Sequence, residues 1–354
     1  MNLAASLLRS ADARADRVAV RLDGSELTYR ELNEASARVA ALVQERGLRP
    51  GDRVGIMLPN VIQFAVVYYG VLRAGCMVIP MNPLLKAREV EYYLADSGAR
   101  MVFAWHAVAA EAQPGAKEAD ALCVTVEPTP TAVLDAGPQA DAVADRDDDD
   151  TAVILYTSGT TGHPKGAELT HANLRRNIES VTGPDLFDLA EEDVIFGGLP
   201  LFHAFGQTCA LNAAVSAGAC LTLLPRFGPA KVLEIIQRDR VTIFEGVPTM
   251  YAALLGQPDR SRYDVDGLRL CASGGAAMPV EVMRAFERAF GCIVLEGYGL
   301  SETSPVASFN HPGRERKAGS IGTESRDDAE RGDVLDAAEA RESLIAAIRS
   351  RSTR

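Results

Sequence analysis

The sequence has no long uninterrupted apolar run, although 47% of its 354 residues are hydrophobic. No window approaches the roughly eighteen apolar residues that a membrane-spanning helix requires. Residues 1–17 place charges too early for the apolar core of a signal peptide. We therefore expect a soluble, cytoplasmic protein without an integral membrane segment.

Basic residues are also scarce, with 36 Lys and Arg against 48 Asp and Glu and a net charge of −12. This balance argues against nucleic acid as a partner, because such binding depends on basic contacts to phosphates. The six cysteines form no CxxC pair and no cluster with histidine. Buried thiols in a reducing compartment are favoured over disulfides or a zinc site.

The most informative stretch lies at residues 150–174. A short apolar run at 152–156 predicts a buried strand, and a polar loop follows it. The loop consists of Thr157, Ser158, Gly159, Thr160, Thr161 and Gly162, and then His163, Pro164, Lys165 and Gly166. Glycines let backbone N–H groups approach an anion, while the hydroxyls add donors and the lysine adds a positive charge. The combination predicts a polyphosphate-binding loop.

The spacing of this loop is not that of a P-loop, which requires Gly-x4-Gly-Lys-Ser/Thr. Counting from Gly159, Pro164 occupies the second glycine position, and Gly166 follows the lysine. A P-loop nucleoside triphosphatase is thereby excluded. The alternative at this point is a surface loop that is rich in Ser, Thr and Gly and binds nothing.

Strand-like and helix-like segments alternate along most of the chain, which predicts βαβ units and a largely parallel sheet. A β-hairpin is expected at 18–29, and Thr28 with Glu31 has the form of a helix capping box. The pattern is weaker over 107–150. Within it, the acidic run at 145–150 predicts a solvated linker ahead of the phosphate-loop strand, with a metal-binding cluster as the alternative.

Four further runs combine glycine with functional side chains, at 199–206, 246–250, 273–279 and 297–303. The second and third follow predicted strands and open helices, which is where α/β folds bind ligands. Taken alone, His203 in the first run is more often a packed histidine than a functional one. The 273–279 run is equally compatible with a plain tight turn.

Together, and in this order, the phosphate loop and these runs resemble the AMP-forming acyl-CoA synthetase superfamily, most closely its long-chain fatty-acid–CoA ligases. Residues 317–323 also fit. The resemblance implies an α/β fold for residues 1–323. This would be the large N-terminal domain of the adenylate-forming enzymes, with stacked, mostly parallel sheets flanked by helices.

The resemblance also implies functional residues. ATP and AMP would be bound by Thr157, Ser158, Gly159, Thr160, Thr161, Gly162, Lys165, Gly274, Gly275, Ala276, Gly297, Tyr298, Gly299, Ser301 and Glu302. The acyl pocket would be lined by His203, Phe205, Gly206, Val247 and Pro248. Lys165 and Glu302 would be catalytic, and Thr157 and Glu302 would hold Mg²⁺. Ser301 stands where the commonest form of the motif has threonine.

The implied activity is an ATP-dependent carboxylate–CoA ligase that works through an acyl-adenylate, with ATP, Mg²⁺ and CoA. A fatty acid is favoured over an amino acid because residues 199–215 contain no acidic side chain to anchor an amine. Aryl acids such as coumarate remain open, as does a homodimer. The alternative from another class is a non-catalytic nucleotide- or acyl-binding protein.

The resemblance ends after Thr323. Residues 324–354 are rich in charge, without aromatic residues or proline, and predict a solvated helix or a disordered tail. The Thr-Gly-Asp run of the superfamily, and the C-terminal lid domain with its lysine, are not recognisable there. We therefore expect a truncated chain with impaired turnover. A frameshift or gene remnant is favoured over a purposeful short protein.

Overall fold

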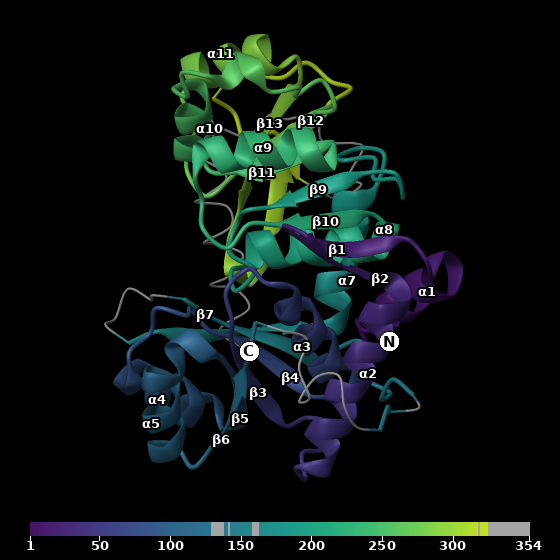
Figure 1. Cartoon of the computed structure of the whole chain (residues 1–354), viewed down its shortest axis with the longest axis vertical. Coiled ribbons are helices and arrows are strands. Elements are labelled where there is room, and N and C mark those ends of the chain that lie inside the picture. The colour runs from purple at the N-terminus through teal and green to yellow at the C-terminus, as the bar shows by residue number, and fades with distance from the viewer. Residues whose placement is uncertain (129–137, 141, 158–162, 318, 325–354) are drawn as a thin grey trace.

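The computed structural model describes residues 1–128, 138–140, 142–157, 163–317 and 319–324, which form two sheets with helices around them (Figure 1). The upper half of Figure 1 contains β9–β13 with α9–α11, and the lower half contains β3–β7 with α4 and α5. The six-stranded sheet has the order β6-β5-β3-β4-β7-β8. The nine-stranded sheet has the order β15-β14-β13-β12-β11-β9-β10-β1-β2.

The strands of the smaller sheet are β3 (Arg53–Met57), β4 (Met77–Pro80), β5 (Ala99–Trp105), β6 (Leu122–Val126), β7 (Thr151–Thr157) and β8 (Lys165–Thr170). Those of the larger sheet are β1 (Val18–Leu22), β2 (Ser25–Thr28), β9 (Val194–Gly197), β10 (Cys220–Leu223), β11 (Ile243–Gly246), β12 (Leu270–Ser273), β13 (Ile293–Gly299), β14 (Val306–Phe309) and β15 (Thr323–Glu324). Most neighbouring strands are parallel, and the antiparallel pairs are β1–β2, β7–β8, β13–β14 and β14–β15. The predicted α/β class with mostly parallel sheets is confirmed.

The α-helices are α1 (Ala5–Arg14), α2 (Tyr29–Glu45), α3 (Ile62–Arg73), α4 (Ala87–Ser97), α5 (Ala109–Glu118), α7 (His171–Thr182), α8 (Ala213–Ala217), α9 (Pro229–Asp239), α10 (Pro248–Leu255) and α11 (Val280–Phe290). The shorter helical segments are η1 (His106–Val108), η2 (Gly206–Asn212), η3 (Arg260–Arg262) and η4 (Ser301–Thr303), of which η2 is a π-helix. None of the described helices is long and apolar enough to cross a membrane.

The two sheets are joined through α3, which contacts β1 of the larger sheet and β3 and β4 of the smaller one. Eleven of its twelve residues are buried. A helix that is apolar on all sides is stable in water only when it is covered on all sides. Two of its tyrosines form hydrogen bonds with Asn212. The Tyr69 hydroxyl donates to Asn212 Oδ1 at 2.8 Å, and Asn212 Nδ2 donates to the Tyr68 hydroxyl at 3.0 Å.

Local sequence signals are accurate at the start of α2. The Thr28 hydroxyl accepts from the Glu31 N–H at 3.2 Å, and the Glu31 carboxylate accepts from the Thr28 N–H at 2.8 Å. Both halves of the predicted capping box are present. The hairpin of β1 and β2 is also present, and its β1 strand pairs in parallel with β10.

The weak segment at 107–150 contains more structure than its pattern indicates. It includes α5, which has Pro114 in its interior, and β6, which pairs in parallel with β5. The α5 helix packs against α4 and β6. This packing offsets the low helix propensity of proline. Sequence patterns alone do not reveal such packing.

The acidic run at 145–150 is mostly exposed and includes a turn at 148–149. Asp148 pairs with Arg175 at 2.8 Å and with the N-terminal amine at 2.6 Å. The carbonyls of Asp148 and Asp150 accept from the first N–H groups of α7, at 3.0 Å each. The run therefore positions the start of α7. Among the described residues, no group of three or more His, Cys, Asp or Glu side chains could hold a metal ion.

His171, the first residue of α7, has a buried neutral ring. It is 1% exposed, and its Nδ1 accepts from the Leu3 N–H at 3.0 Å. Desolvation, aided by the positive charges of Arg146 and the N-terminus, lowers the pKa of His171 to about 4. The unfolded chain therefore takes up a proton near pH 6.5, while the folded protein does so only near pH 4.

We predict that His171 makes the free energy of unfolding fall by about 3 kcal/mol as the pH drops from 6.5 to 4, because the unfolded state binds the extra proton in that window. Substituting His171→Asn keeps an acceptor near Leu3 but cannot titrate, so it should remove most of that pH dependence. Urea unfolding at several pH values measures it. His106→Asn, at an exposed histidine, should leave the slope unchanged. If both variants show the same dependence of the free energy of unfolding on pH, His171 is not its source.

Candidate active site

Four of the predicted ligand-binding runs meet at one edge of the larger sheet. The strands β13, β12, β11 and β9 are consecutive neighbours in that sheet and run parallel. Their carboxyl ends therefore lie side by side. The runs at 297–303, 273–279, 246–250 and 199–206 begin at these ends or just beyond them. Open α/β sheets bind ligands at this edge.

The predicted nucleotide-binding and acyl-pocket residues are in contact there. A Cβ on Gly274 would lie 2.8 Å from Cε1 of Phe205, so this position accepts only glycine without a shift of the ring. Gly275 has a φ of +78°, which other residues rarely adopt, and a Cβ on it would lie 3.4 Å from Cγ1 of Val247. The Gly274 N–H donates to the Gly246 carbonyl at 3.3 Å. Three of the runs thus share one surface.

Asn60, just before α3, holds the turn that leads into the His203 run. Its Nδ2 donates to the carbonyls of Gly197 and Leu199 at 3.0 and 2.7 Å, and its Oδ1 accepts from the Leu201 N–H at 3.0 Å. Asn60 is buried. The sequence analysis missed this role, because the partners lie about 140 residues away and no local signal connects them.

His203 itself is exposed, with its ring 4.6 Å from that of Phe202. Partial desolvation lowers the pKa of His203. Gly206 begins the π-helix η2, and Pro248 begins α10. Such π-helical turns occur frequently at functional sites.

The described residues on either side of the predicted phosphate loop belong to an antiparallel pair of strands, the β7–β8 hairpin. Thr157 ends β7 and pairs with Lys165, which begins β8. The sequence analysis anticipated the first strand but not the second. Lys165 is exposed. Ser158, Gly159, Thr160, Thr161 and Gly162 lie outside the described residues.

Aromatic residues of α4 contact this hairpin at the ends of its strands, beside Thr157 and Lys165. The Tyr92 hydroxyl donates to the Pro164 carbonyl at 2.7 Å, and the Tyr93 ring stacks on Tyr156 with centroids 4.3 Å apart. Tyr156 in turn donates to Asp96 Oδ2 at 2.6 Å. Desolvation raises the pKa of Tyr156, so it stays a donor. These α4 residues were not anticipated, because they carry no motif of their own.

The 297–303 run reaches across to the smaller sheet. Gly297, Tyr298 and Gly299 lie in β13, where half-buried Tyr298 pairs with Ser308 of β14. Ser301 and exposed Glu302 lie in η4, which packs against β8. Ala276 is exposed in the turn after β12.

Asn177 of α7 fixes this approach. Its Nδ2 donates to the carbonyls of Val306 and Thr303 at 2.8 and 3.4 Å, and its Oδ1 accepts from the Val306 N–H at 3.2 Å. Because α7 follows β8 directly, the hairpin with Lys165 and the segment with Glu302 are held together. The two sheets therefore contribute to one candidate site.

Thr157 and Glu302, the predicted Mg²⁺ ligands, supply hydroxyl and carboxylate oxygens. Hard oxygen donors suit Mg²⁺, which commonly keeps several waters and substrate phosphate oxygens beside one or two carboxylates. With so few protein donors, phosphate and water would complete the coordination. The donor chemistry fits the ion.

Glu296 is a further residue that the sequence analysis missed. It lies in β13 just before Gly297 and is 6% exposed. Its carboxylate accepts from the Met278 N–H at 3.1 Å and from the Gly319 N–H at 3.3 Å. Burial raises the pKa of Glu296, and the two N–H groups oppose that shift. The residue links the 273–279 turn to the 317–323 run.

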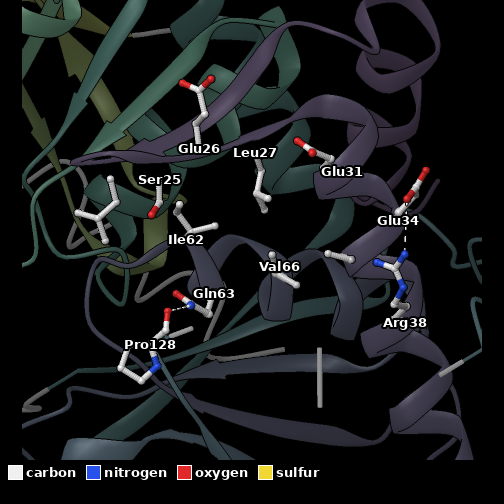
Figure 2. Close-up of a pocket in the computed structure, with 12 residues that line it drawn as sticks. Ser25, Glu26, Leu27, Glu31, Glu34, Arg38, Ile62, Gln63, Val66 and Pro128 are labelled. Atoms are coloured by element: carbon white, nitrogen blue, oxygen red, sulfur yellow. Dashed lines mark hydrogen bonds and ion pairs between the residues drawn. The ribbon is translucent and has the colours of Figure 1, made fainter. Parts of the chain in front are cut away.

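A cavity of about 370 Å³ lies elsewhere, between the β1–β2 hairpin and the helices α2 and α3 (Figure 2). Figure 2 shows Ile62 and Val66 among the residues that line it, with Gln63 donating to the Pro128 carbonyl at 2.9 Å. Its walls include Glu26, Glu31, Glu34 and Arg38. None of the predicted site residues lines it, so this cavity is not the candidate site.

Comparison with known proteins places the chain in the family of AMP-binding enzymes. A family model described as AMP-binding enzyme matches residues 7–342. A long-chain-fatty-acid–CoA ligase of Bacillus subtilis (strain 168) is 35% identical, covering 90% of this chain and 63% of the relative. A feruloyl-CoA synthase of an Amycolatopsis species is also 35% identical, over 87% of this chain and 61% of the relative.

Among solved structures, the anthranilate CoA ligase AuaEII in complex with anthranoyl-AMP has a TM-score of 0.86 at 28% identity. The match covers 92% of this chain and 63% of the anthranilate CoA ligase. The chain thus spans less than two thirds of the length of these two relatives and of this ligase. The match to the family model runs into the segment predicted to be a tail. Residues 325–354 lie outside those described, so the predicted boundary at 323 stays a prediction.

We predict that Glu296→Ala lowers the free energy of unfolding by about 2–4 kcal/mol, because two N–H groups lose their acceptor. It should also weaken ATP binding, since the 273–279 turn loses its anchor. Urea unfolding and equilibrium ATP binding measure the two effects. Glu281→Ala, at an exposed glutamate in the first turn of α11, should change stability by less than about 0.5 kcal/mol. A similar change in both variants would show that Glu296 does not anchor the turn.

Proposed function

Because the chain belongs to the family of AMP-binding enzymes, we propose that it activates a small carboxylic acid with ATP and transfers the acyl group to coenzyme A. The observation that supports this most directly is the approach of η4, with Ser301 and Glu302, to the hairpin that presents Lys165. The polyphosphate and the adenine ring belong to one ATP molecule, so the residues proposed to bind them must lie close together.

In the proposed first step, a carboxylate oxygen of the acid attacks the α-phosphorus of ATP, and the bond to pyrophosphate breaks. The products are an acyl-adenylate and pyrophosphate. In the second step, the CoA thiol attacks the acyl carbon, loses its proton to solvent and displaces AMP. The acid is already ionised at neutral pH, so the first step requires no general base. His203 is accordingly proposed as a pocket wall.

We assign roles to the site residues on the same basis. Lys165 and the 157–162 loop would bind the β- and γ-phosphates, since a cation and backbone N–H groups stabilise developing negative charge. Tyr298 would stack on adenine, against the glycines at 274 and 275, and Ser301 would bind the phosphate region. Thr157 and Glu302 would hold Mg²⁺, which when bound neutralises phosphate charge.

A fatty acid is the proposed substrate class, and an aryl acid is the second. The first rests on the absence of acidic residues at 199–215 and on the similarity to the B. subtilis fatty-acid ligase. The second is supported by the similarity to a feruloyl-CoA synthase. The cytoplasmic location, the homodimer and the impaired turnover stay predictions.

Carboxylate-dependent ATP–pyrophosphate exchange tests the proposal on the 354-residue chain, with short, medium and long fatty acids and with aryl acids. We expect exchange with at least one acid and a loss of tenfold or more in Lys165→Ala. The matched control Lys117→Ala, at an exposed lysine of α5, should retain the wild-type rate.

Absence of exchange with every acid would overturn the proposal that these residues carry out adenylation. Equilibrium ATP binding on the same samples then separates the remaining readings. Binding that Lys165→Ala weakens, without exchange, would indicate a nucleotide-binding protein that does not turn over.

A further inference from the structure

Three polar side chains next to the candidate site are fully buried and incompletely hydrogen-bonded. Gln207, Thr208 and Glu245 are each 0% exposed. Among the described residues, seven buried side-chain nitrogen or oxygen atoms lack a hydrogen-bond partner, and four of these belong to the three residues. The four are Gln207 Oε1, Thr208 Oγ1 and both carboxyl oxygens of Glu245.

The three side chains lie between β11 and η2. Side chains alternate along a strand, and Phe244 stacks on Phe196 on one face of the sheet. Glu245 therefore points to the opposite face, with Ile243. That face packs in one core with Cys209 of η2, and burial together with the proximity of Glu245 raises the pKa of the Cys209 thiol. Gln207 and Thr208 precede Cys209 in the same π-helix.

The neighbours of Glu245 on the sheet are small. Ala272 of β12 is its register partner, and Gly197 occupies the corresponding position at the end of β9. Two residues beyond Glu245 lies Val247, and one residue before η2 lies Phe205. Both are residues of the proposed acyl pocket. Phe205 packs against the same core as Ile243 and Cys209, which brings the buried polar group next to this residue of the proposed pocket.

Leaving such groups unpaired is costly. A buried polar atom without a partner destabilises a protein by about 1–3 kcal/mol, and more when it is charged. Elsewhere in this fold, buried polar residues such as Asn60 and Asn212 have their partners within the chain. Unsatisfied buried groups in a folded protein require an explanation, and a bound ligand is one that the position supports.

We propose that Glu245, with Gln207 and Thr208, binds a hydroxyl or amino group on the acyl part of the substrate, at the end remote from the reacting carboxylate. This rests on the proposed function and assigns a specificity-determining residue to it. The substrate is then not a plain hydrocarbon acid but one that carries an O–H or N–H donor.

The chemistry of the three side chains supports this class. Gln207 Oε1 is an acceptor, and the Thr208 hydroxyl both donates and accepts. Burial raises the pKa of Glu245 well above its usual range, which favours the neutral carboxyl. A neutral carboxyl both donates and accepts hydrogen bonds. A ligand hydroxyl matches such a set. A ligand ammonium would instead ionise Glu245 and form a buried ion pair.

Equilibrium binding of matched acids to the 354-residue chain tests the proposal. One series is decanoate, 10-hydroxydecanoate and 10-aminodecanoate, and the other is cinnamate, 4-hydroxycinnamate and 4-aminocinnamate. In at least one series, we expect a donor-bearing acid to bind tenfold or more tightly than its unsubstituted parent. Glu245→Met, which keeps the volume without the polar atoms, should reduce that preference to about twofold or less.

A second variant separates the two donor chemistries. Glu245→Gln keeps a hydrogen-bonding group but cannot ionise, so preference for a hydroxyl should persist while preference for an amine should be lost. Thermal unfolding tests for a purely structural role, because loss of a structural residue would lower the unfolding temperature. Since removing an unpaired buried group is neutral or stabilising, Glu245→Met should unfold at the same or a higher temperature.

The outcomes distinguish the two levels of the argument. If acids of both series bind without any preference, or if Glu245→Met keeps the preference, the assignment of Glu245 is overturned and the proposed function stands. Destabilisation of Glu245→Met with an unchanged preference would likewise assign the residue to the structure alone. If no acid of either series binds, the proposed function fails together with the assignment.

Discussion

The burial of α3 between the two sheets is the constraint on which the rest of the structure depends. The helix is apolar on nearly every side, and it contacts strands of both sheets. Burial of a Val, Leu, Ile or Phe side chain contributes about 1.5–3 kcal/mol, so a helix of this kind strongly favours an arrangement in which both faces are covered. The sheets are stacked because each covers one side of it.

This stacking places polar groups as well as apolar ones. Asn60 stands at the start of α3 and binds the turn at 197–201, which leads from β9 into the His203 run. Tyr69 of the same helix binds Asn212, the last residue of η2. The helix that joins the sheets therefore also sets both ends of the segment proposed to wall the acyl pocket. Packing and function are coupled through a few hydrogen bonds.

Buried polar groups in this protein fall into two kinds. Asn60, Asn177 and Glu296 each accept or donate two or more hydrogen bonds within the chain, and each joins segments far apart in sequence. Glu245 lacks any such partner among the described residues. The first kind defines the shape of the site. The second kind lowers the stability of the fold. Selection for ligand binding, rather than for folding, would retain such a residue beside the proposed pocket.

The sequence by itself determined the fold class, the alternation of strands and helices along most of the chain, the capping box at Thr28 and Glu31, and the glycine-containing runs at strand ends. These are local features that depend on residues a few positions apart, so composition and periodicity reveal them. It also placed Phe205, Val247, Gly274 and Gly275 in one candidate site, through their motifs.

Only the tertiary structure decided that Lys165 begins a strand, that α5 forms despite Pro114, and that η2 is a π-helix. It also identified Asn60, Tyr92, Glu296 and Glu245. Each of these depends on contacts that no short sequence window contains: the partners of Asn60 lie 137 and 139 residues away, and that of Tyr92 lies 72 away. Local patterns determine which elements can form, and burial against distant elements determines which side chains meet.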